Sequence, residues 1–262
     1  METQWYVYVF AILGGILAGI INTLAGSGSV VTLPILVMLG LPANVANATN
    51  RVGVTIQNVV GITTFQRKGH LNLEGGLWYT VAALPGAVVG AWIASNLSKE
   101  QMNYAIGVVM VIMLFLVLLN PQKWLREQSE VAEGRPSILM LLIFFGIGIY
   151  GGFIQAGIGV LILTALVMGV GYNLAHANAI KLMIVLAVTI VALVVFMVQG
   201  LVNWPIGLLM AVGQSIGAWA AATYAVSAKN ANIWVRRLLI AVIVFSIFKF
   251  FGVFDLIGGL MG

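Results

Sequence analysis

The second half of this sequence repeats the first half at a fixed spacing. An ungapped register places Ala156-Gly157 131 residues after Ala25-Gly26, and it pairs Gly40 with Gly171. The same register pairs Gly28 with Gly159, Ala46-Asn47-Ala48 with Ala177-Asn178-Ala179, Gly69 and Asn72 with Gly200 and Asn203, and Gly86-Ala87 with Gly217-Ala218. One register that holds over both halves indicates an internal duplication, so the fold should consist of two related units.

Each half contains five apolar segments. They cover residues 5–24, 28–41, 44–66, 74–96 and 101–119, and then 137–155, 158–171, 175–199, 205–226 and 236–254. A helix needs about 20 apolar residues to cross a bilayer. The second segment of each half has only about 14 residues and would rise about 21 Å as a helix. These two short segments are expected either to re-enter the membrane or to span it with difficulty.

The composition places the chain in a membrane. Hydrophobic residues make up 61% of the sequence, and charged residues make up only 7%. Soluble domains carry roughly 25% charged residues. Since open strands cannot cross lipid, we predict an all-α integral membrane protein. The N-terminal stretch METQWYVYVFAILGG lacks a basic region, so it is expected to be a retained first helix.

Several functional classes are not expected. The chain has no cysteine, which excludes disulfides, iron–sulfur clusters and thiolate chemistry. It carries no Walker A loop, HExxH motif or serine nucleophile elbow, so we predict neither an enzyme nor a cofactor or metal. The basic residues lie mostly in short loops, where they set topology, so nucleic acid is not an expected partner.

Basic residues in the loops predict an inverted repeat. Arg67-Lys68 follows the third segment of half one, and Lys229, Arg236 and Arg237 follow the fourth segment of half two. A linker with Lys123, Arg126 and Arg135 joins the halves. Placing all three regions in the cytoplasm leaves Lys99 outside and puts the N-terminus outside. We therefore predict repeat 1 at 1–120, a cytoplasmic linker at 121–136 and repeat 2 at 137–262, which together form one transport domain.

The third segment of half one carries an unusual polar stripe. At 100° per residue, five side chains fall within about 80° of one another: Asn44, Asn47, Arg51, Thr55 and Asn58. In half two the polar positions are Asn178, Lys181 and Thr189, and Lys181 aligns with Asn50, one residue from Arg51. No acidic residue lies in a predicted span near either cation. We infer that an anionic substrate joins Arg51 and Lys181, with Asn47, Asn50 and Asn178 as donors. The alternative is that each basic side chain snorkels to an interface.

A glycine-rich turn precedes each short segment. The first turn includes Asn22, Gly26, Ser27, Gly28 and Ser29, and the second includes Gln155 and Gly157. If the segments are re-entrant, the N-termini of the short helices converge on the protein centre and suit an oxyanion. Ser27 and Ser29 either cap the helix or donate to the ligand. Pro34 should lie in the first helical turn or kink the helix.

His176 lies near a predicted inner mouth. It could titrate during proton coupling, and the alternative is a purely structural role.

The chain resembles the TauE/SafE sulfite-exporter family of membrane permeases. The resemblance rests on NTLAGSGSVVTLPILVMLGLPANVANATNRVG with GHLN after it, and on GFIQAGIGVLILTALVMGVG and ANAIK in half two. Half two departs from the pattern, with Ile158 for the usual glycine or serine and Ala165 at the proline position. The resemblance implies a bacterial inner-membrane protein that exports or takes up sulfite, sulfonates or related sulfur anions.

The sequence thus predicts a secondary transporter that works by alternating access around a central anion site. Its expected partners are a small anionic substrate and the lipid bilayer, and a homo-oligomer is left open. The rival functions are an anion channel with the same charged residues along a pore, and a membrane scaffold or assembly factor that transports nothing.

Overall fold

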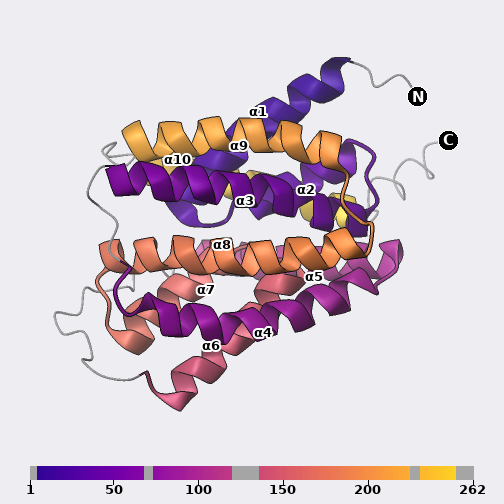
Figure 1. The fold of residues 1–262 in the computed structure, drawn as a ribbon. Helices are drawn as coiled ribbons and strands as arrows, with labels where there is room; N and C mark the ends of the chain where they lie inside the picture. Colours follow the sequence, from indigo (N-terminus) through magenta and orange to yellow (C-terminus); the bar gives the residue numbers. More distant parts are fainter. Residues whose placement is uncertain (1–4, 68–72, 120–135, 225–230, 252–262) are drawn as a thin grey trace.

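The computed structural model describes residues 5–67, 73–119, 136–224 and 231–251, and these form helices joined by short loops (Figure 1). The first half contains α1 (Trp5–Ala25), α2 (Ser29–Met38), α3 (Ala43–Arg67), α4 (Gly76–Ser95) and α5 (Lys99–Leu119). The second half contains α6 (Ile138–Phe153), α7 (Ile158–Thr164), the π-helix η2 (Ala165–Val170), α8 (Leu174–Val198), α9 (Trp204–Tyr224) and α10 (Ala231–Phe250). The predicted all-α fold is confirmed for these ranges.

Three helices of the described ranges are long and apolar enough to cross a membrane by themselves. They are Gly76–Ser95, Lys99–Leu119 and the His176–Val198 part of α8. The helix α3 is long enough, with 25 residues, but its polar side chains lower its hydropathy. Because the polar residues of α3 are largely buried, its neighbours in the protein shield them from lipid. The chain is a multi-pass membrane protein.

Each half packs its helices against helices of the other half. Under the 131-residue register, α1 corresponds to α6 and α4 to α9. The structure packs α1 against α9 and α4 against α6, and it packs α3 and α8 against each other (Figure 1). The start of α3 lies near the end of α8, since Thr49 Oγ1 accepts a hydrogen bond from the backbone N–H of Asn203 at 2.9 Å. The equivalent helices α3 and α8 therefore run in opposite directions.

Backbone angles at the turns repeat in both halves. Gly26 and Gly157 are equivalent, and their φ angles are +67° and +72°. Gly40 and Gly171 are also equivalent, with φ angles of +89° and +91°. Only glycine adopts this left-handed conformation without a steric cost, so the duplicated glycines preserve the same two bends in each half.

The short second segments differ from each other and from the sequence prediction. In half one, Pro34 lies in the second turn of α2 and not in the first, so its ring nitrogen cannot donate to the carbonyl of Val30. In half two, the α-helix α7 has only 7 residues and continues as the π-helix η2 from Ala165. The π-helix thus begins at the position equivalent to Pro34. Both second segments are short, as predicted, but only the first is α-helical throughout.

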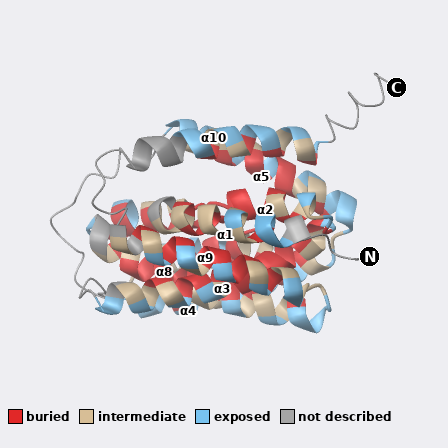
Figure 2. Ribbon diagram, turned by 90° about the horizontal axis from the view of Figure 1, so that it is seen from above, coloured by how far each residue is buried: buried red, intermediate tan, exposed pale blue. Residues whose placement is uncertain are grey.

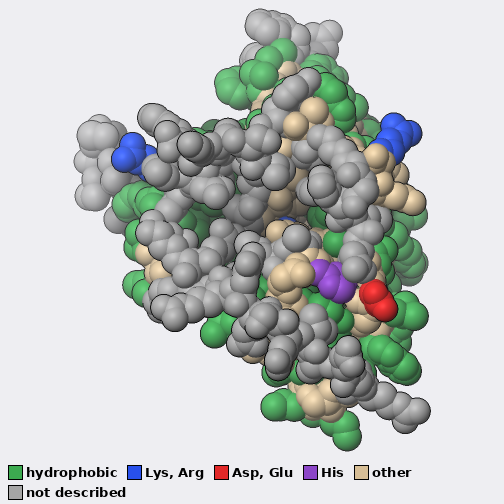
Figure 3. Space-filling view, turned by 90° about the vertical axis from the view of Figure 1, so that its left-hand side faces the viewer, with side chains coloured by type: hydrophobic (Ala, Val, Ile, Leu, Met, Phe, Trp, Pro, Cys, Tyr) green, Lys and Arg blue, Asp and Glu red, His purple; other side chains and the backbone are tan. Residues whose placement is uncertain are grey.

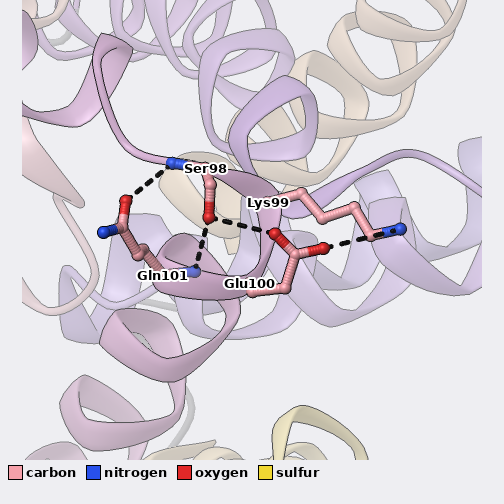
Figure 4. A network of polar contacts seen from close by, with 4 residues as sticks. All are labelled: Ser98, Lys99, Glu100 and Gln101. Atoms are coloured by element: carbon pink, nitrogen blue, oxygen red, sulfur yellow. Dashed lines mark hydrogen bonds and ion pairs between the residues drawn. The ribbon is translucent and has the colours of Figure 1, made fainter.

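Buried residues concentrate between the helices of the bundle (Figure 2). The pair of α5 and α10 packs together at one edge, and α10 also contacts α2. A polar turn precedes α5 (Figure 4). There Ser98 Oγ accepts from the N–H of Gln101 at 3.2 Å, and Gln101 Oε1 accepts from the N–H of Ser98 at 2.9 Å. This reciprocal capping box starts α5 directly after the end of α4.

The close packing of α4 on α6 leads to a testable prediction about stability. A Cβ built on Gly90 would lie 1.9 Å from the carbonyl oxygen of Ile149. Gly90→Ala should therefore force the two helices apart and lower the free energy of unfolding by about 1–3 kcal/mol. Thermal unfolding of the purified protein in detergent measures this effect. The matched control is Gly146→Ala on α6, where a Cβ meets no atom within 4 Å. Equal melting of the two variants would contradict the prediction.

Candidate anion site

The two glycine-rich turns meet in the interior of the protein. A Cβ built on Gly26 would lie 3.0 Å from the Cα of Gly159 and 3.7 Å from Nζ of Lys181. The backbones of the two halves thus touch where the short helices begin. Both turns were predicted to converge on the centre, and the structure places them in direct contact.

A small cavity lies beside this contact. Its volume of about 10 Å³ has room for about one water molecule. The lining combines polar and apolar side chains from both halves: Asn22, Gly26, Ser29, Val54, Asn58, Gln155, Ile158, Gly159, Lys181, Leu182 and Val185. Five predicted site residues are in this lining, namely Asn22, Gly26, Ser29, Gln155 and Lys181.

Lys181 brings the positive charge to the cavity. Its residue surface is 3% exposed, and Nζ donates to Oδ1 of Asn178 at 2.9 Å. No acidic residue is among the side chains that line the cavity. A buried ammonium with a neutral amide as its hydrogen-bond acceptor suits an anion as a further partner. Asn178 is thus adjacent to the cavity through Lys181, although it is not in the lining.

Arg51 has a different set of partners, at the C-terminus of α6. One guanidinium nitrogen donates to the carbonyl of Gly151 at 2.7 Å and to Oε1 of Gln155 at 2.6 Å. The other donates to the carbonyl of Gly152 at 3.0 Å. Asn47 adds a bond from Nδ2 to the carbonyl of Phe153 at 2.7 Å. Arg51 and Asn47 together satisfy the last three carbonyls of α6, which the helix itself leaves without partners.

This capping explains how Arg51 is buried without an acidic partner. The C-terminal end of a helix carries a partial negative charge, and Arg51 lies directly on it. The ring of Phe196 also lies below the guanidinium, with its centroid 5.6 Å from Cζ. Helix α6 ends at Phe153, three residues before the position equivalent to the end of α1. This early helix end is a source of negative charge beside Arg51 that the residue pattern does not reveal.

Gln155 connects Arg51 to the cavity. Its φ angle of +68° is the left-handed region, which a residue with a side chain rarely adopts. This backbone turns the side chain so that Oε1 accepts from Arg51 while Nε2 donates to Oγ1 of Thr189. Gln155 is 2% exposed and lines the cavity. Arg51 therefore contacts this glutamine without lining the cavity, whereas Lys181 lines it.

The remaining predicted residues shape the first turn and α2. Asn50 donates from Nδ2 to Oγ of Ser29 at 3.0 Å, and its Oδ1 accepts from Oγ1 of Thr32 at 2.5 Å. Asn22 Oδ1 accepts from the N–H of Gly28 at 3.2 Å, and Gly28 is the N-cap residue of α2. Ser27 is buried in the same turn. Gly157 faces away from the cavity, because a Cβ there would lie 2.2 Å from Sδ of Met113.

His176 lies at one end of the molecule and not in the cavity lining. Nε2 is 3.1 Å from the carbonyl oxygen of Glu74, and the ring packs on Tyr172 at 4.5 Å between centroids. Figure 3 shows this end, where a histidine and an acidic side chain lie close together. The contact joins the start of α8 to the residues before α4. A structural role is visible here, and the coupling role stays a prediction.

Asn58 and Thr189 were both noted on the polar stripes but not chosen as site residues. Asn58 lines the cavity, and Thr189 holds Gln155. The register pairs these two positions, since Thr189 follows Asn58 by 131 residues. That equivalence is the signal by which the sequence could have pointed to them.

The contact between the two turns leads to a second testable prediction about stability. A Cβ built on Gly159 would lie 2.7 Å from the Cα of Gly26 and 2.8 Å from its carbonyl oxygen. Gly159→Ala should push the turns apart and lower the free energy of unfolding by about 1–3 kcal/mol. The melting temperature in detergent reports this change, with Gly61→Ala as the control because a Cβ there meets no atom within 4 Å. A melting temperature like that of the control would show that the turns are not in close contact.

Comparisons with known proteins give one family model and several relatives. The model described as "Sulfite exporter TauE/SafE" matches residues 11–250. A probable membrane transporter protein, ORF9, from a Sinorhizobium species is 26% identical over 92% of this chain and 91% of its own length. The probable membrane transporter protein YfcA of Escherichia coli K12 is 28% identical over 77% of this chain and 74% of its own. A probable membrane transporter protein of Haemophilus influenzae is 25% identical over 78% and 79%. No solved structure matches the chain significantly.

Proposed function

The chain belongs to the sulfite exporter TauE/SafE family of membrane transporters, and on this premise we propose that it is a secondary transporter of small sulfur oxyanions or sulfonates. The observation that carries this proposal is the cavity at the meeting point of the two turns. It combines a buried ammonium, polar side chains from both halves and no acidic lining residue. An anion is the ligand that this set of groups favours.

Seven of the predicted residues have a proposed role around the anion. Lys181 supplies the charge, and Asn178 orients its ammonium. Asn22 and Ser29 offer polar side chains from the first turn, at the positive N-terminal end of α2. Arg51 and Asn47 hold the C-terminal end of α6 beside the cavity. Gln155 accepts a hydrogen bond from Arg51 and also lines the cavity, so it links this helix end to the lining.

Alternating access fits the small volume of the cavity. A space for about one water molecule is too small for a sulfur oxyanion, so substrate entry requires the halves to move. The opposed directions of α3 and α8 support an inverted repeat, in which rocking one half against the other exposes the site to each side in turn. We place the N-terminus outside and the linker in the cytoplasm of a bacterial inner membrane. The membrane potential then favours anion export by roughly 2.3 kcal/mol per charge per 100 mV.

Transport by the purified protein in liposomes tests the proposal. Vesicles loaded with unlabelled sulfite, thiosulfate, sulfate, taurine, sulfoacetate or chloride are diluted into trace labelled anion of the same kind. With the membrane potential clamped at zero by valinomycin and equal potassium on both sides, only a carrier accumulates the label transiently by exchange, and this counterflow distinguishes it from a channel.

Counterflow with one sulfur anion would support the proposed function and identify the substrate. Flux without counterflow would favour the channel. Absence of flux for the whole panel would contradict sulfur-anion transport.

A further inference from the structure

Asn58, a residue of the cavity lining, has an unused hydrogen-bond acceptor. It lies on α3, is 1% exposed and belongs to the lining. Its Oδ1 atom is buried and has no hydrogen-bond partner. Buried amide oxygens are normally satisfied, so an unpaired one beside a binding cavity points to a ligand group that donates.

The orientation of this amide follows from its other hydrogen bond. Nδ2 of Asn58 donates to the carbonyl oxygen of Val54 at 2.8 Å, one turn earlier on the same helix. A flipped amide would place Oδ1 against that carbonyl, and two acceptors would then face each other. Asn58 therefore directs its oxygen, and not its NH₂ group, away from the carbonyl of Val54, so Oδ1 is the unpaired polar atom of a side chain in the cavity lining.

An oxyanion without a hydrogen atom would fit this lining poorly. Its oxygens would be attracted by the ammonium of Lys181 and repelled by Oδ1 of Asn58. Lys181 is the charged side chain of the lining, and its ammonium donates to Asn178 and not to Asn58. A ligand that carries both a negative group and a hydroxyl would satisfy both residues.

We propose that the cavity selects small oxyanions that also bear a hydrogen-bond donor, with the donor directed at Oδ1 of Asn58 and the negative group at Lys181. This inference rests on the proposed function and narrows its substrate class. A sulfonate with a hydroxyl group is the simplest member of that class. A water molecule bound to Asn58 is the competing occupant, and it would give no preference between ligands.

Binding of two sulfonates of equal charge and similar shape tests the inference. Isethionate ends in a hydroxyl group, and 1-propanesulfonate has a methyl group at the same place. Their dissociation constants are measured by calorimetry on the purified full chain in detergent, with inorganic sulfite as a third probe. The variants are Asn58→Leu, which removes the acceptor, and Asn44→Leu, a control on the same helix outside the lining.

We expect wild type and Asn44→Leu to bind isethionate about tenfold more tightly than 1-propanesulfonate, and Asn58→Leu to bind both equally. The ratio in wild type is informative even if Asn58→Leu does not fold. Equal binding in wild type, a ratio that survives in Asn58→Leu, or binding of sulfite alone would overturn the inference while the anion site stands. Absence of binding for all three probes would overturn the inference and the proposed function together.

Discussion

Arg51→Leu is expected to destabilise the protein strongly, whether or not substrate is present. The change leaves the carbonyls of Gly151 and Gly152 and the Oε1 atom of Gln155 without their donor. Each buried acceptor left unpaired costs about 1–3 kcal/mol, so the free energy of unfolding should fall by about 3 kcal/mol or more. Thermal unfolding in detergent without added anion measures this loss.

The matched control is Arg67→Leu, the same chemical change at the exposed end of the same helix. It should alter the free energy of unfolding by no more than about 0.5 kcal/mol. If Arg51→Leu melted like this control but no longer bound anions, Arg51 would be a substrate ligand and not the cap of α6.

Lys181→Met is expected to have the opposite pattern, with the fold retained and anion binding lost. A buried ammonium is unfavourable for folding, and methionine has a similar length without the charge. The charged hydrogen bond to the anion would disappear, so the affinity for the transported anion should fall about 10- to 100-fold. Calorimetric binding and thermal unfolding on the same sample separate the two effects.

Lys99→Met is the control for this second variant. Lys99 is the exposed first residue of α5, where its ion pair with Glu100 at 3.7 Å contributes little. Both its binding and its melting should match wild type. Anion binding by Lys181→Met at wild-type affinity would exclude Lys181 from the site.

Much of the fold could be predicted because it follows from pattern. The scarcity of charge, the apolar segments and the 131-residue register predicted helices in two related halves, and the paired glycine angles agree with that register. The end of the short second helices could not be predicted in the same way. Pro34 in α2 and the π-helix from Ala165 depend on how each segment packs, and residue patterns do not record that.

The sequence by itself determined which residues are available for an anion site. Polar side chains in a membrane chain must face protein or water, so the stripes on α3 and α8 could be read directly. The tertiary structure alone decided which cation faces the cavity. Helix α6 ends early and directs its free carbonyls at Arg51, whereas Lys181 has Asn178 as its hydrogen-bond partner and lines the space between the turns. A carbonyl is present in every residue, so only the position of a helix end reveals which of them can neutralise a buried charge.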